Sequence, residues 1–262
     1  MKAFWQFILI VILTTLIISV YSFIDLELQI TGVVIKKSKI KEFLTFEKAE
    51  FKLNIDSIIQ IDTIIEEKKD TVVIDTTSQK ILIIGDSMLE GLSLRLRDYT
   101  AYNGHEINTV IWYSSTSEVY GKCDTLKYFI KTYKPTYVML VLGANELFIS
   151  DIKEKRKGYV DEIIKQMDTI PYVWVGPPNW KEDTGINELI LEKVGEGKYY
   201  PSKNLTYQRA SDGAHPTRES AVVWMDSIAS WIRTSSNYRI KLEVPDKRYK
   251  ISANTTLLQP IK

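Results

Sequence analysis

The stretch Lys80-Ile-Leu-Ile-Ile-Gly-Asp-Ser87 decides the fold that this sequence predicts. A continuous apolar run that ends in a glycine is typical of a strand buried on both faces of a parallel sheet. The residues that follow it, 89–99, have the pattern of a helix. A buried strand that turns into a helix at a glycine predicts the first unit of an α/β domain.

The alternation of strands and helices continues beyond this first unit. Further strands are predicted at 106–113, 136–142 and 172–175, with a short fifth strand near 204–207, and further helices at 124–133, 156–167 and 218–233. Strands that alternate with helices form a parallel sheet with helices on both faces. Because ligands bind such a sheet at the carboxyl ends of its strands, the functional residues are expected where the strands end.

Three short motifs come at or just after the ends of the first, third and fifth predicted strands. They are Gly85-Asp86-Ser87, Gly143-Ala144-Asn145-Glu146 and Asp212-Gly213-Ala214-His215. We therefore expect the fold to bring all three together at one edge of the sheet. Each motif alone has a plainer explanation: a serine that caps a helix, an asparagine that holds its own loop, and a loop histidine bound to a turn aspartate. Together they supply the groups that acyl transfer requires.

The candidate catalytic residues are Ser87, His215 and Asp212, and Asn145 is a candidate oxyanion donor. Ser87 is expected at a helix N-terminus, where backbone N–H groups favour developing negative charge. Asp212 lies three residues before His215 across a Gly-Ala turn, so its carboxylate can orient the imidazole that takes the serine proton. An Asn side-chain N–H is a known kind of oxyanion donor.

In order and spacing, these motifs resemble those of the SGNH/GDSL hydrolase superfamily, and the resemblance covers residues 79–235. It implies a flavodoxin-like, three-layer α/β/α fold with a parallel sheet. It also implies that Ser87 is the nucleophile, that Asp212 and His215 complete the triad, and that Asn145 and the Ser87 N–H belong to the oxyanion hole. No metal ion and no cofactor are implied.

The chain departs from the family pattern at three places. The first motif continues Ser87-Met-Leu-Glu-Gly91 rather than Ser-Leu-Thr. Glu146 stands where the family usually has an aspartate. After the second predicted strand, where the family uses a glycine N–H, this chain has Trp112-Tyr-Ser-Ser-Thr-Ser117 and no glycine until Gly121. The N–H of Ser114 or that of Ser115 is expected to serve as the missing oxyanion donor, and the sequence does not choose between them.

The candidate substrate-binding residues are Asn179, Trp180 and Trp112. Gly176-Pro177-Pro178-Asn179-Trp180 follows the fourth predicted strand, where the resemblance implies a wall of the cleft. Trp180 is then a candidate platform for a sugar ring, because an indole offers a large flat apolar face. A rigid loop that packs on the domain explains the same sequence equally well.

The N-terminal segment differs from the rest of the chain, because residues 3–24 contain no charged side chain and are long enough to span a bilayer as a helix. Lys2 precedes this run, so the positive flank is expected in the cytoplasm and the remaining chain on the other side. Residues 1–24 are expected to be a transmembrane anchor or, alternatively, a cleaved signal. The expected location is the bacterial inner membrane, single-pass, with a periplasmic catalytic domain. Residues 25–78 are expected to form an extracytoplasmic spacer, and 236–262 a C-terminal tail.

The composition excludes some partners and covalent links. The 262 residues carry a formal net charge of +1 and no basic run, so no nucleic-acid partner is expected. The single cysteine excludes an intramolecular disulfide.

The sequence predicts a serine esterase that removes O-acyl groups, acetyl above all, from an envelope or extracellular glycan. Two alternatives remain: an O-acetyltransferase that works with a multi-spanning membrane acyltransferase, or a non-catalytic SGNH-fold subunit of an envelope complex.

Overall fold

The computed structural model of the chain describes residues 6, 29–30, 33–34, 73–250 and 253–260. By its internal contacts the chain divides into two units, Met1–Lys69 and Asp70–Lys262. In the first unit, strands β1 (Gln29–Ile30) and β2 (Val33–Val34) form an antiparallel pair.

The N-terminal predictions fall mostly on residues outside these ranges. Nearly all of the expected anchor, 1–24, and most of the expected spacer, 25–78, lie outside the described residues. Among the residues that are described, no helix is both long enough and apolar enough to cross a membrane.

The second unit is built on a six-stranded sheet in which all neighbouring strands are parallel. The order across the sheet is β7-β6-β5-β3-β4-β8. The strands are β3 (Lys80–Gly85), β4 (Glu106–Trp112), β5 (Tyr137–Val141), β6 (Tyr172–Val175), β7 (Tyr199–Tyr200) and β8 (Asn254–Leu258). This arrangement confirms the parallel α/β sheet that the sequence predicts.

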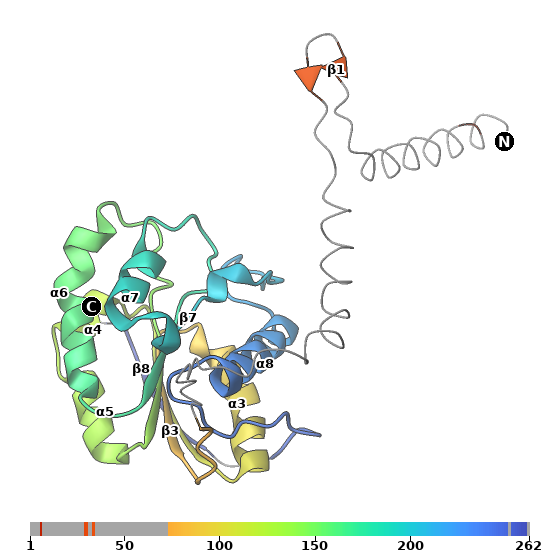
Figure 1. Cartoon of the computed structure of the whole chain (residues 1–262). Coiled ribbons are helices and arrows are strands. Elements are labelled where there is room, and N and C mark those ends of the chain that lie inside the picture. Colours follow the sequence, from red (N-terminus) through yellow and green to blue (C-terminus); the bar gives the residue numbers. More distant parts are fainter. Residues whose placement is uncertain (1–5, 7–28, 31–32, 35–72, 251–252, 261–262) are drawn as a thin grey trace, which may run out of the picture. The chain divides into compact units, whose positions relative to one another are not determined.

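Helices cover both faces of the sheet, which makes three layers (Figure 1). One face carries α3 (Leu89–Asn103) and α8 (Arg218–Thr234). The other carries α4 (Ser117–Gly121), α5 (Thr125–Tyr133), α6 (Ile152–Met167) and α7 (Ile186–Val194). Two short 3-10 helices, η1 (Glu196–Lys198) and η2 (Ser202–Asn204), flank β7.

The central strand β3 shows why the apolar run predicted the fold. Ile81 and Ile83 pack into the core beneath α3 and α8, while Leu82 and Ile84 pack into the core on the opposite face. All four side chains have no exposed surface. Burial of each such side chain contributes about 1.5–3 kcal/mol, so a strand buried on both faces has to be apolar at every position.

The fifth strand does not lie where the sequence predicts it. Residues 204–207 form no strand, and β7 lies earlier, at Tyr199–Tyr200. Pro201 follows β7 at once and lacks the N–H needed to continue a sheet ladder. The chain therefore leaves the sheet through η2, and the Asp212–His215 motif lies on a loop before α8 rather than at the end of a strand.

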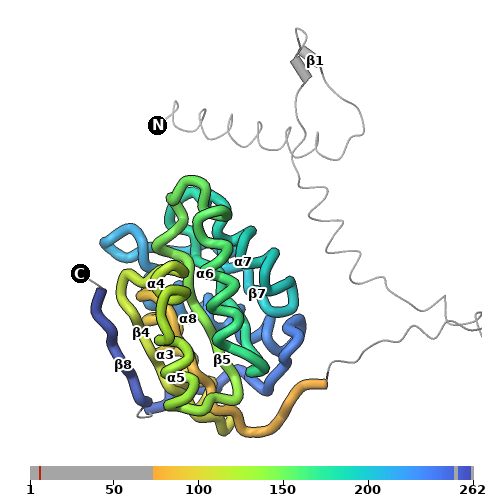
Figure 2. Tube along the Cα trace, turned by 90° about the vertical axis from the view of Figure 1, so that its left-hand side faces the viewer, coloured from red at the N-terminus to blue at the C-terminus, as the bar shows by residue number. Residues whose placement is uncertain are grey.

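The C-terminal segment after α8, which the sequence analysis set apart as a tail, packs on the second unit. Ile240 and Leu242 are buried in the core beneath α3 and α8. Strand β8 then pairs in parallel with β4 and forms one edge of the sheet (Figure 2).

Candidate active site

The turn between β3 and α3 places Ser87 at the carboxyl edge of the sheet. Gly85 ends β3 with a φ of +154°, and a Cβ atom there would lie 1.8 Å from the carbonyl oxygen of Val141 on β5. The next residue, Asp86, donates its N–H to the same carbonyl at 3.0 Å. Because Gly85 has no side chain, β3 and β5 can approach closely at this point. Ser87 follows at the shared end of the two strands and is partly exposed.

The buried carboxylate of Asp86 links the first motif to the second. It accepts hydrogen bonds from the N–H groups of Met88, at 2.9 Å, and Ala144, at 3.2 Å. Burial raises the pKa of Asp86 to about 6, although these N–H groups act in the opposite direction. Asp86 thus ties the loop that carries Ser87 to the loop that carries Asn145.

The structure brings Ser87, His215 and Asp212 into one hydrogen-bonded chain. The Nε2 atom of His215 lies 2.8 Å from Oγ of Ser87. Its Nδ1 atom lies 2.7 Å from Oδ2 of Asp212. This is the geometry of a Ser-His-Asp triad, in which the imidazole can take the serine proton while the carboxylate fixes its tautomer.

Asp212 is held as an anion by the turn that contains it. Its Oδ1 atom accepts the N–H groups of Ala214, at 2.9 Å, and His215, at 3.0 Å. The N–H of Ala214, followed by the imidazole and the N–H of His215, lowers the pKa of Asp212 to about 2. The carboxylate is therefore charged at neutral pH and can steady the imidazolium that forms during proton transfer.

The triad loop is fastened by a guanidinium that the sequence analysis did not single out. Arg209 donates to the carbonyl of Ala214 at 2.8 Å, and to those of Pro178 and Asn179 at 2.9 and 2.7 Å. Two backbone bonds close the loop as a short hairpin, Ala210 N–H to His215 and Thr217 N–H to Gln208, both at 2.8 Å. Arg209 therefore joins the histidine loop to the loop after β6.

The two serines that are candidate oxyanion donors differ in whether their backbone N–H is free. The N–H of Ser115 donates to the carbonyl of Trp112 at 3.2 Å, so it is already used in a turn. Ser114 is exposed, has a φ of +57°, and its N–H has no acceptor among the described residues. That left-handed conformation is one in which glycine is normally favoured. Ser114 is therefore the serine of this pair with a free donor.

Asn145 and Glu146 fix the second motif in different ways. One N–H of the Asn145 amide donates to the carbonyl of Ser115 at 2.9 Å, which leaves its other N–H for a ligand. The fully buried Glu146 accepts the N–H and the hydroxyl of Ser117, at 2.7 and 2.9 Å, and Nε of Arg156, at 2.7 Å. Burial raises the pKa of Glu146 in spite of these partners. Glu146 thus anchors the Asn145 loop to the start of α4.

The three candidate substrate-binding residues lie in different surroundings. Trp180 donates its indole N–H to the carbonyl of Ala144, directly before Asn145, at 2.9 Å. Asn179 accepts a hydrogen bond from the amide of Asn187 at 3.0 Å. Trp112 is 6% exposed and donates to the carbonyl of Gln259, so its ring belongs to the core rather than to the cleft.

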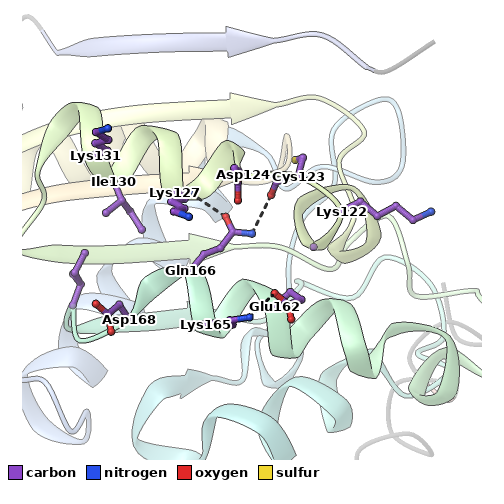
Figure 3. Close-up of a pocket in the computed structure, with 12 residues that line it drawn as sticks. Lys122, Cys123, Asp124, Lys127, Ile130, Lys131, Glu162, Lys165, Gln166 and Asp168 are labelled. Carbon is purple, nitrogen blue, oxygen red and sulfur yellow. Dashed lines mark hydrogen bonds and ion pairs between the residues drawn. The ribbon is translucent and has the colours of Figure 1, made fainter.

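Two cavities differ in their relation to the triad. One of about 230 Å³ lies against Ser87 and His215, between the starts of α3 and α8. A larger one, of about 660 Å³, lies between α5 and α6, and none of its lining residues belongs to the three motifs (Figure 3). In the part of the chain that the structure describes, no cluster of three or more His, Cys, Asp or Glu residues could hold a metal ion.

No family model matches the chain, and no curated protein matches it. Solved structures that resemble it include the esterase EstA of Pseudoalteromonas sp., at 16% identity and a TM-score of 0.44 over 59% of this chain and 96% of EstA. A lipase/acylhydrolase from Enterococcus faecalis has 19% identity and a TM-score of 0.45, over 59% and 95% of the two chains. A family 3 carbohydrate esterase from Clostridium thermocellum has 16% identity and a TM-score of 0.44, over 59% and 94%. Likeness at this level carries no argument about function, which has to come from the site itself.

Proposed function

We propose that this chain is a serine-dependent carboxylic ester hydrolase of the SGNH/GDSL type. The observation that carries the proposal is the hydrogen-bonded chain from Ser87 through His215 to Asp212, with distances of 2.8 and 2.7 Å. Nucleophile, base and orienting acid are all present at hydrogen-bonding distance, as acyl transfer requires. A non-catalytic subunit would have no need of these three groups in this geometry.

The reaction follows from the placement of these groups. As Oγ of Ser87 attacks the ester carbonyl, Nε2 of His215 takes its proton and Asp212 steadies the imidazolium. The N–H groups of Ser87 and Ser114 and the side chain of Asn145 are the proposed donors to the oxyanion. His215 then protonates the leaving alcohol, and a water molecule activated by His215 releases the acid from the acyl-enzyme.

We propose hydrolysis, rather than transfer to a sugar hydroxyl, because the base is open to solvent. The side chains of His215 and Asp212 are 38% and 50% exposed. A transferase has to keep water from the acyl-enzyme until the acceptor binds. An imidazole this accessible favours water as the acceptor.

We propose an O-acylated glycan as the substrate class. An aromatic pair supports this proposal, with the ring centroids of Trp180 and Phe148 6.2 Å apart. Phe148 is 54% exposed, and the ammonium group of Lys181 lies over both rings. The pair is bonded to the Asn145 loop through Trp180, and aromatic rings at a protein surface can pack against sugar rings. Acetyl is the proposed acyl group.

We also propose that the enzyme acts outside the cytoplasm, held at the inner membrane by its N-terminal segment. The uncharged run 3–24, preceded by Lys2, supports this proposal. A multi-spanning acyltransferase as a partner is the corresponding proposal for the transferase alternative.

Turnover of p-nitrophenyl acetate by the full-length chain, with Ser87→Ala as the matched variant, tests the proposal. We expect release of p-nitrophenol that falls on the order of 10⁴-fold or more in the variant. Acetylated glycans then identify the substrate, and added sugar acceptors test transfer. A folded wild-type chain without turnover of any ester would favour the transferase or the non-catalytic subunit.

A further inference from the structure

The cavity beside the triad continues away from Ser87 into a second cavity. The first, of about 230 Å³, and the second, of about 290 Å³, share Gly91, Leu94 and Arg218 among their lining residues. We call the two together the α3–α8 groove. It is separate from the larger cavity between α5 and α6, with which it shares no lining residue.

The groove follows one face of α3. Its α3 residues fall in neighbouring pairs that recur every three or four positions, which places them on one side of a helix: Glu90 and Gly91, Leu94 and Arg95, and Arg97 and Asp98. At a rise of 1.5 Å per residue, the distance along the chain from Ser87 to Asp98 corresponds to roughly 15 Å. The opposite wall comes from the start of α8 and, at the far end, from the segment 248–250.

The near and far ends of the groove differ in chemistry. Next to Ser87 and His215, apolar side chains line most of the wall: Met88, Leu94, Pro216 and Ala221. The far end is basic. The groove as a whole is lined by five basic residues, all of which line the far cavity, and by only two acidic ones, Glu90 at the near end and Asp98 at the far end. The cavity between α5 and α6 has four lysines against three carboxylates, so it has almost no such excess.

The acidic residue at the far end is already neutralised. Asp98 is buried, lies 3.4 Å from Arg95, and accepts the N–H of Tyr249 at 2.8 Å. Arg95 also pairs with Asp226 at 2.8 Å. These contacts cancel the charge of Arg95 within the protein, and none of them involves the other cations of the groove.

Four cations remain to face a ligand. Arg218, Arg248 and Lys250 are exposed and have no ion-pair partner in the part of the chain that the structure describes. Arg97 donates one N–H to Oγ1 of Thr255 at 2.8 Å, and its Nε is buried with no acceptor among the described residues. Cations that outnumber the carboxylates of a concave site concentrate an anionic ligand there.

We propose that the α3–α8 groove binds an acidic stretch of the glycan substrate, with carboxylate or phosphate groups held by Arg97, Arg218, Arg248 and Lys250. The proposal rests on the proposed function and sharpens it to esters on acidic glycans. The sugar unit that carries the ester lies against the apolar end, and an acidic unit roughly 15 Å along the chain lies at the basic end. Neutral glycans lack the second contact.

Binding to the full-length Ser87→Ala variant tests the groove without any need for turnover. The ligands are an oligouronate, a poly(glycerol phosphate) oligomer and a neutral xylo-oligosaccharide, each at low and high salt. We expect at least one acidic ligand to bind about tenfold more tightly than the neutral one, with the difference lost at high salt. The uronate and phosphate arms then identify which anion the groove selects.

A pair of double variants places the binding in the groove. Arg248→Gln with Lys250→Gln is expected to weaken the acidic ligand about tenfold. The matched pair Lys131→Gln with Lys165→Gln, in the cavity between α5 and α6, is expected to leave it unchanged. Equal affinity for neutral and acidic ligands, or equal loss in both double variants, overturns the proposal.

The two proposals fail separately. If p-nitrophenyl acetate is not hydrolysed but acidic ligands bind and respond to Arg248→Gln with Lys250→Gln, the esterase proposal is wrong and the groove stands. If the ester is hydrolysed but no acidic ligand is preferred, the groove proposal is wrong and the esterase stands.

Discussion

The two halves of the triad are held by different kinds of structure. Ser87 follows a strand in the middle of the sheet, next to the buried Asp86 and to a glycine that lies against β5. Asp212 and His215 lie on a partly exposed hairpin, fixed by backbone bonds and by Arg209. The nucleophile is thus positioned by the core of the domain, and the base by local hydrogen bonds at its surface.

This difference predicts how each half responds to mutation. A change on the serine side disturbs packing that the whole domain depends on, so stability and activity fall together. A change on the histidine side breaks contacts within one loop, so activity falls while the domain stays folded.

Replacement of Asp212 by Asn is expected to give the largest effect on activity. The amide keeps the size of the side chain but cannot stabilise the imidazolium or hold the correct tautomer. We expect kcat on p-nitrophenyl acetate to fall on the order of 10⁴-fold, with the denaturant midpoint nearly unchanged. Asp161→Asn, which removes a surface ion pair with Lys193, is the matched control and should keep full activity. A large loss of stability in Asp212→Asn would contradict the contrast.

Replacement of Gly85 by Ala is expected to give the largest effect on stability. The new Cβ would lie 1.8 Å from the Val141 carbonyl oxygen, so β3 and β5 must separate. We expect a loss of about 3 kcal/mol or more in the free energy of unfolding, with activity lost in parallel. Gly104→Ala is the control, because it has a φ of +75° but no atom within 4 Å of the new Cβ. It should cost only about 1 kcal/mol, and equal effects of the two changes would sink the steric explanation.

The buried Asp86 gives the serine side a pH dependence. Its pKa in the folded chain, about 6, lies above the value near 3.9 expected in an unfolded chain. The folded state therefore binds the extra proton between these values, and stability falls as pH rises from about 4 to about 6. The contribution is roughly 2–3 kcal/mol. As pH rises across that range, we expect the unfolding free energy of the wild type to fall relative to that of Asp86→Asn. A difference that does not change between pH 4 and pH 7 would contradict the raised pKa.

The sequence predicts those parts of the molecule whose structure is determined by residues close together in the chain. The apolar run of β3 marks burial on both faces, and the two residues between Asp212 and His215 are few enough for the side chains to meet across a turn. Strand β8 is not predicted from the sequence, because Asn254-Thr-Thr-Leu-Leu258 has no distinctive apolar pattern. The strand forms a sheet edge, and its residues are exposed or half-buried. Its place depends on pairing with β4, far away in the sequence.

The catalytic surroundings show the same division between local and long-range causes. The choice between Ser114 and Ser115 depends on one backbone angle and one turn hydrogen bond, which the pair of serines in the sequence does not specify. Arg209 was missed because its partners are carbonyl groups, which every residue has. Two of them belong to the loop after β6, about thirty residues earlier.

Arg209 provides the smallest of the expected effects and the sharpest test of the histidine side. Arg209→Lys keeps the charge but cannot reach three carbonyls at once, because only the guanidinium has the planar fork of donors. We expect kcat on p-nitrophenyl acetate to fall about tenfold while KM changes little, since Ser87 and the side of its cavity formed by α3 are untouched. In Arg209→Ala, added guanidinium ions should restore part of the lost kcat, which a general loss of folding would not allow. Arg233→Lys, in a surface ion pair with Glu243, is the control. If guanidinium restores nothing, or if kcat in Arg209→Lys equals that of the wild type, the hairpin positions His215 without the hydrogen bonds of Arg209.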